Sequence, residues 1–127
     1  MITMTYRHAR LINDLVEYVH QGNVKAGWWS DLHTGERVER NMGELLCLVH
    51  SEISEAMEGH RKNLMDDKLP HRKMLEVELA DALIRIFDIC GAHGLDLGGA
   101  IQEKLAYNQK REDHKVENRK LDNGKKF

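Results

Sequence analysis

Apolar residues recur at helical spacing in four segments of the chain, with polar residues at the positions between them. In the first segment, residues 5–20, the apolar positions are Leu11, Ile12, Leu15, Val16 and Val19. Gly22 is expected to end this helix. The second helix is expected to follow Asn41, an N-cap with Glu44 three residues later, and to end near Leu64.

Two more helices are predicted in the C-terminal half. Pro70 is expected to open the third, because its missing N–H costs little in a first turn, and this helix ends near Gly91–Gly94. The fourth runs from about Leu97 to Arg111. The third is apolar around most of its circumference, so we expect it to be the buried, central helix of a bundle. Because no alternating strand pattern occurs, the predicted fold class is all-α.

The remaining segments are a loop and a tail. Residues 21–40 lose the periodicity and contain the pair Trp28-Trp29. Irregular loops of this length are uncommon in compact domains and often bind ligands. Residues 112–127 carry five basic and four acidic side chains. We therefore expect one domain over residues 1–111 and a charged tail over 112–127 that is extended or becomes ordered on binding.

The composition excludes several classes of protein. A chain of 127 residues with 41% apolar and 31% charged residues suits one folded domain. Its formal net charge of −2 disfavours a nucleic-acid binder, which would usually carry a basic surplus. No apolar run approaches the ~18 residues of a membrane span, and no signal peptide is recognised. Cys47 and Cys90 lie in apolar helical patterns, which favours buried, reduced thiols in a cytoplasmic protein over a disulfide.

Four polar residues form one stripe along the otherwise apolar third helix. They are Glu78, Asp81, Arg85 and Asp88, at spacings of 3, 4 and 3, within an arc of roughly 80°. Buried carboxylates are costly unless they are paired or bound to a cation. Arg85 can pair with Asp81 or Asp88, whereas Glu78 has no partner on its own helix.

The second helix contributes a further acidic pair, Glu52 and Glu55. If the two helices pack antiparallel, this pair faces Glu78 and Asp81, and the four carboxylates repel unless divalent cations neutralise them. Ligation by oxygen alone suits Mg²⁺ or Mn²⁺ rather than zinc. An ExxE pair by itself is also typical of a solvated helix face, but the ExxD pair inside an apolar helix favours a metal site.

Three polar residues of the fourth helix share a face. Lys104, Asn108 and Arg111 stand at positions i, i+4 and i+7. A cation, an amide and a guanidinium in line are suited to holding phosphate oxygens, and an ordinary solvated face is the alternative.

Three segments of the chain together resemble the MazG-like, all-α nucleoside triphosphate pyrophosphohydrolases. They read HSEISEAMEGHRK at 50–62, EVELADALIRIFD at 76–88 and EKLAYNQKREDHK at 103–115. The family signature is ExxE, a spacer and ExxD, and here Glu52-Ile53-Ser54-Glu55 is separated by 22 residues from Glu78-Leu79-Ala80-Asp81. The resemblance covers roughly residues 28–126, and the sequences of these segments are similar to those of the small phage and bacterial branch of the family.

The resemblance implies a reaction and its cofactor. A nucleoside triphosphate is cut between the α and β phosphates to give a monophosphate and pyrophosphate. Glu52, Glu55, Glu78 and Asp81 would bind Mg²⁺, with Mn²⁺ as a substitute and two or three ions per site. Either Glu52 or Glu55 would accept the proton of the attacking water.

The resemblance also implies further contacts and an assembly. The phosphate-contacting positions of the family are matched by Lys104, Asn108 and Arg111. Arg85 would orient the metal-binding carboxylates by forming salt bridges with them. Family members form dimers, or tetramers built from dimers, so a four-helix chain is expected to be a homo-oligomer. The MazZ-like enzymes of this branch remove dGTP, which favours a guanine nucleotide as substrate, in control or cleansing of the nucleotide pool.

The base-binding residues are expected in the loop. Trp28 and Trp29 present π faces on which a nucleobase can stack, with Lys25 nearby, and the alternative is that a tryptophan fills the bundle or an interface.

Three other functions compete with the enzyme. A non-catalytic helical dimerisation or nucleotide-binding module would explain the helices but not the acidic residues Glu78 and Asp81. A di-iron bundle normally needs two ExxH motifs, and the chain has one, at residues 17–20. A nucleic-acid binder would use the tryptophans and the basic tail, but the acidic site would repel its phosphates.

Overall fold

The computed structural model describes residues 4–127, and within them the chain is helical with turns and loops. Only two isolated β-bridges occur in this part, Ser30–Arg37 and Met65–Lys73, so the all-α prediction is confirmed. The chain divides into two compact units, one of residues 15–95 and one that joins the N-terminal segment up to residue 14 with residues 96–127. None of the described helices has the length and apolar character needed to cross a membrane.

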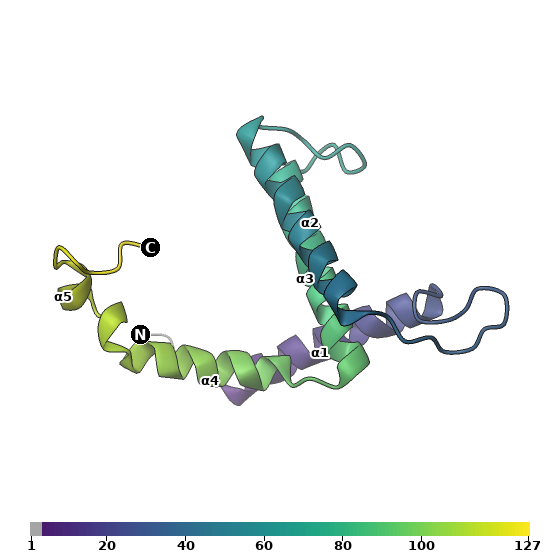
Figure 1. Cartoon of the computed structure of the whole chain (residues 1–127), viewed down its shortest axis with the longest axis horizontal. Helices are drawn as coiled ribbons and strands as arrows, with labels where there is room; N and C mark the ends of the chain where they lie inside the picture. Colours follow the sequence, from purple (N-terminus) through teal and green to yellow (C-terminus); the bar gives the residue numbers. More distant parts are fainter. Residues whose placement is uncertain (1–3) are drawn as a thin grey trace. The chain divides into compact units, whose positions relative to one another are not determined.

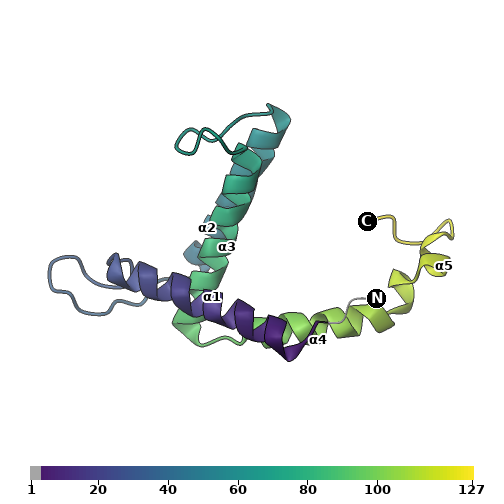
Figure 2. The ribbon, with the colours of Figure 1, turned by 180° about the vertical axis from the view of Figure 1, so that it is seen from behind.

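Two antiparallel helices form the body of the 15–95 unit. Helix α2 (Met42–Arg61) and helix α3 (Met74–His93) lie side by side along their length (Figure 1, Figure 2). Asn41 caps α2 as predicted, since its side chain accepts the N–H of Glu44 at 3.0 Å. The antiparallel packing brings the ExxE pair of α2 opposite the ExxD pair of α3.

The connection between α2 and α3 is longer than predicted. Pro70 lies in a turn, and α3 begins four residues later, so the prediction that Pro70 opens the helix is wrong. The cause is Asp66, whose buried carboxylate accepts the N–H groups of Lys68 and Leu69 at 3.0 and 2.8 Å and holds the chain in a turn. The other end was predicted correctly, since Gly94, with φ of 62°, caps α3.

Helix α1 (Tyr6–Lys25) continues through Gly22, which was expected to stop it. Ala26 N–H bonds to the Gly22 carbonyl at 3.0 Å, and the chain leaves the helix at Gly27, whose φ is +89°. A single glycine costs a helix only about 1 kcal/mol relative to alanine, so the helix continues through Gly22. The chain leaves the helix five residues later, where Gly27 takes a positive φ. The loop is correspondingly shorter, at residues 26–41.

A small core attaches this loop to the helices. Trp29 is 0% exposed and packs with Leu45 and Ile89. Its Nε1–H donates to both oxygens of the buried Asp88, at 3.0 and 3.2 Å, and Nδ1 of His20 lies 2.8 Å from the same carboxylate. Asp88 of α3 therefore ties the loop and α1 to the helix pair.

The sequence predicted that helix α3 is buried on all sides, but in the single chain it is buried on one side only. Its buried residues are Glu78, Ala82, Asp88, Ile89 and Cys90. The other cysteine, Cys47 of α2, is exposed, so the prediction that both thiols are buried is wrong for this residue. Large apolar side chains on α2 and α3 remain exposed, because each helix covers only one side of the other: Leu46, Ile53, Met57, Leu79, Leu83 and Ile84. Five of these residues are called the apolar face below; Ile84 is left out, because it lines a cavity with Asp81 and Arg85.

The second unit is built around helix α4 (Leu97–Lys110). Asp96 caps it by accepting the N–H of Gly99 at 2.9 Å, and Asn13 bonds both to Asp96 and to the N–H of Gly98. Residues 112–127, the predicted tail, form the 3₁₀ turn η1 (Glu112–His114) and the single helical turn α5 (Val116–Arg119).

Candidate metal centre

The antiparallel helices bring three glutamates together. One carboxylate oxygen each from Glu52, Glu55 and Glu78 lies within 4.8 Å of the other two. Glu55 is exposed and Glu52 half-buried, whereas Glu78 is 8% exposed. Oε2 of Glu78 is inaccessible to solvent and has no hydrogen-bond partner among the described residues. A buried oxygen without a partner is destabilising unless a proton or a cation satisfies it.

The electrostatics of the cluster favour a positive ligand. Burial and the neighbouring Glu52 and Glu55 carboxylates together raise the pKa of Glu78 to about 8, with burial as the largest cause. Burial also raises the pKa of Asp81, with the Glu52 charge as the next cause. Glu78 and Asp81 therefore bind protons more tightly than free acids do, and a divalent cation would replace those protons.

The donor set fits a hard divalent ion. All the candidate ligands are carboxylate oxygens, which Mg²⁺ and Mn²⁺ accept, and the orphaned oxygen of Glu78 supplies a ligand that nothing else in the described structure occupies. Asp81 lies one helical turn beyond Glu78 and is half-buried.

Arg85 pairs with a different carboxylate from those predicted. Its Nε donates to Oε1 of Glu52 across the helix pair at 2.9 Å, rather than to Asp81 or Asp88 on its own helix. Asp88 is already occupied, since its carboxylate accepts from Trp29 and lies against His20.

A cavity of about 460 Å³ adjoins the cluster in the same unit. Glu52 and Asp81 line it, as do Arg85, Arg40 and Trp28. It thus combines candidate metal ligands, two guanidinium groups and an indole face. Arg40 was not singled out from the sequence; its place at the end of the tryptophan loop, directly before the N-cap of α2, is the signal that would have pointed to it.

The two tryptophans have different environments. Trp28 is 63% exposed and lines the cavity, whereas Trp29 is completely buried in the core. Trp29 therefore has no face free for a base, and its expected stacking role is corrected to a structural one. Lys25, at the end of α1, is exposed and is not among the residues that line this cavity.

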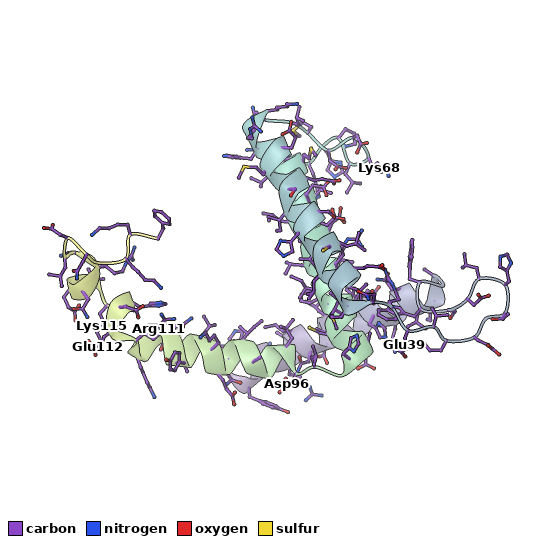
Figure 3. All side chains as sticks on the ribbon, viewed as in Figure 1. Glu39, Lys68, Asp96, Arg111, Glu112 and Lys115 are labelled. Atoms are coloured by element: carbon purple, nitrogen blue, oxygen red, sulfur yellow. The ribbon has the colours of Figure 1, made fainter. Side chains whose placement is uncertain are left out.

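The expected phosphate-binding residues lie in the other unit. Nζ of Lys104 lies 4.9 Å from the ring centroid of Tyr107, and Oδ1 of the half-buried Asn108 has no hydrogen-bond partner within residues 4–127. Arg111 does not continue the helix, because its backbone is extended and α4 ends one residue earlier than predicted. Its guanidinium binds both oxygens of Asp113, at 3.0 and 2.8 Å, beside the labelled Glu112 in Figure 3.

Comparisons of the chain with protein families, with curated proteins and with solved structures found no match.

Proposed function

We propose that the chain is a Mg²⁺-dependent nucleotide pyrophosphohydrolase that cleaves a nucleoside or deoxynucleoside triphosphate between the α and β phosphates. The observation that carries the proposal is the buried, unpartnered oxygen of Glu78 within the Glu52–Glu55–Glu78 cluster. The adjoining cavity, with its indole and guanidinium groups, has the chemistry to hold a nucleotide. The resemblance of the ExxE and ExxD segments to the MazG-like enzymes supports the same reaction.

Four carboxylates would hold the metal: Glu52, Glu55, Glu78 and Asp81. Bound Mg²⁺, or Mn²⁺ in its place, supplies a more acidic water and neutralises charge on the phosphates, and two or three ions are proposed per site. Glu52 or Glu55 accepts the proton of the attacking water, because these two carboxylates are more accessible than Glu78.

The cavity supplies base recognition. Trp28 stacks on the base, because its exposed indole lines the cavity. The resemblance to the MazZ-like branch favours a guanine base, so dGTP or GTP is the proposed substrate. Its removal would adjust the nucleotide pool or clear an unwanted nucleotide in the cytoplasm.

The assembly is proposed to be a homodimer or a tetramer of dimers. The apolar face of α2 and α3 is exposed in the single chain, and a second copy would complete a four-helix bundle around it. Lys104, Asn108 and Arg111 are proposed to contact phosphate oxygens, for which Arg111 must first release Asp113.

The same apolar face favours a second candidate, a non-catalytic dimerisation or nucleotide-binding module. The two candidates differ in what Glu78 does. In a scaffold, Glu78→Gln removes a buried acid and leaves binding intact, whereas in the enzyme it abolishes turnover.

The test is a product analysis by chromatography. The protein is incubated with Mg²⁺ and each common NTP and dNTP, alongside EDTA-treated and Glu78→Gln controls. We expect a monophosphate and pyrophosphate from one or a few nucleotides, with guanine nucleotides preferred. Diphosphate and orthophosphate would refute cleavage between the α and β phosphates, and no turnover on any nucleotide would favour the scaffold.

A further inference from the structure

Arg85 is bound to one of the carboxylates that the proposed cation would need. Its Nε donates to Oε1 of Glu52 at 2.9 Å, while an oxygen of Glu52 lies within 4.8 Å of oxygens of Glu55 and Glu78. Among the described residues, no other basic side chain forms an ion pair with these glutamates or with Asp81. The guanidinium is thus the one positive charge placed against the cluster in this part of the chain.

The same side chain faces the cavity. Arg85 and Arg40 both line it, but their surroundings differ. Arg40 lies over the ring of the buried Trp29, 5.2 Å from the centroid, which fixes its position. The Arg85 side chain is 37% exposed and its described polar contact is with Glu52 alone, so it can turn into the cavity once that contact is lost.

A guanidinium and a divalent cation compete for the same carboxylate. Both need the lone pairs of Glu52, and their like charges repel at short range. A nucleotide in the cavity would offer the released guanidinium a better partner, because the planar fork of arginine binds phosphate oxygens in a bidentate way.

We propose that Arg85 is a displaceable counter-ion: it neutralises Glu52 in the metal-free protein, and once a divalent cation binds there it turns into the cavity and holds a phosphate oxygen of the nucleotide. This inference rests on the proposed function and deepens it, because it assigns Arg85 two partners one after the other: Glu52 before the cation binds, and a phosphate oxygen afterwards. Arg85 is on this basis a residue that couples metal binding to substrate binding.

The experiment measures the two partners separately, beginning with the metal. Mn²⁺ alone is titrated into wild-type and Arg85→Met protein without nucleotide and followed by electron paramagnetic resonance. We expect the variant to bind Mn²⁺ about threefold more tightly, since the part-exposed ion pair that competes with the metal is gone. If Arg85 only held Glu52 in place, Arg85→Met would instead bind Mn²⁺ more weakly than the wild-type protein.

The nucleotide is measured next, with Mn²⁺ saturating. The probe is the non-hydrolysable α,β-methylene analogue of dGTP, titrated by calorimetry. We expect Arg85→Met to weaken its binding about tenfold, the loss of one charge-assisted hydrogen bond, and Arg85→Lys to restore part of the affinity. Arg61→Met is the matched control, because Arg61 is exposed on α2 and lies 3.7 Å from Glu58, outside the cavity.

Circular dichroism confirms that each variant is folded, and Arg85→Gln replaces Arg85→Met if the latter is not. Unchanged or weaker Mn²⁺ binding by the variant overturns the proposal, as does unchanged affinity for the analogue. Either result leaves the proposed function standing if the wild-type protein binds Mn²⁺ and turns over nucleotide. A wild-type protein that binds no Mn²⁺ would refute both.

Discussion

Glu78 combines burial with a lack of partners, and this sets its behaviour with pH. Its pKa is raised by burial to about 8 in the folded chain, against an ordinary value of 4.5. Between these values the unfolded chain releases the proton while the folded chain keeps it. Because the folded state then binds more protons, the free energy of unfolding falls as the pH rises through this window.

We therefore predict that the metal-free protein loses stability between about pH 4.5 and pH 8, and that Mg²⁺ restores it at pH 8. Urea unfolding in EDTA across this range measures the loss. Glu78→Gln should flatten the pH dependence and remove the effect of Mg²⁺. The control is Glu17→Gln, an exposed residue of α1 that should leave both unchanged. A profile that rises with pH from 5 to 8 would contradict the prediction.

Individual residues of the site were predictable to different degrees. The lack of a partner for Glu78 could be seen from the sequence, because its helix is largely apolar and its polar stripe carries one base, Arg85, among three acids. The partner of Arg85 could not, since it depends on His20 and Trp29, which occupy Asp88 from distant parts of the chain. Local spacing cannot show which of two carboxylates is already taken.

At the scale of an element, the loop of residues 26–41 holds one tryptophan in the core and exposes the next. We predict that Trp29→Ala lowers the free energy of unfolding by about 3–5 kcal/mol, because it empties a fully buried site and leaves Asp88 short of a donor. Chemical denaturation of the purified variant provides the value.

Trp28→Ala is the matched change and should behave in the opposite way. Its effect on stability is expected to stay within about 0.5 kcal/mol, typical of surface sites, while KM for the nucleotide rises about tenfold through lost stacking. Steady-state kinetics and denaturation together decide this. Equal losses of stability in the two variants would show that the assignment of their roles is wrong.

Helix existence was easier to predict than helix ends. All four long helices follow from apolar spacing, and the caps at Asn41 and Gly94 follow from residue type. The end of α1 predicted at Gly22 and the start of α3 predicted at Pro70 are both wrong, because each prediction used a single residue type as a weak local signal. A glycine inside a helix is tolerated, and the turn around Asp66 delays the start of α3 by hydrogen bonds that residue type alone does not specify.

At the scale of the whole molecule, the single chain leaves the apolar face of α2 and α3 uncovered. We predict that the protein sediments as a dimer or larger at micromolar concentration. Leu83→Asp should shift it to the monomer, because Leu83 is a 50% exposed residue of this face and a carboxylate buried there without a partner is costly. Analytical ultracentrifugation measures both states.

The control for this change is Leu32→Asp. Leu32 is 82% exposed in the loop, away from the apolar face, and the substitution should leave the sedimentation unchanged. A wild-type protein that is monomeric at high concentration would argue against self-association through α2 and α3. The sequence predicted the apolar character of α3 correctly, but whether that surface is covered within one chain depends on helix packing, which periodicity does not specify.

The hydrogen bond from Trp29 to Asp88 also makes the indole N–H of Trp29 a probe of local opening. The indole N–H is held within the core, so it exchanges with deuterium only when the loop leaves the helices, whereas the exposed indole of Trp28 has no such protection. The ratio of the two exchange rates, followed by NMR in D₂O, reports how often the loop detaches. Slower exchange of Trp29 with nucleotide present would mean that ligand binding in the neighbouring cavity and closure of the loop are one event.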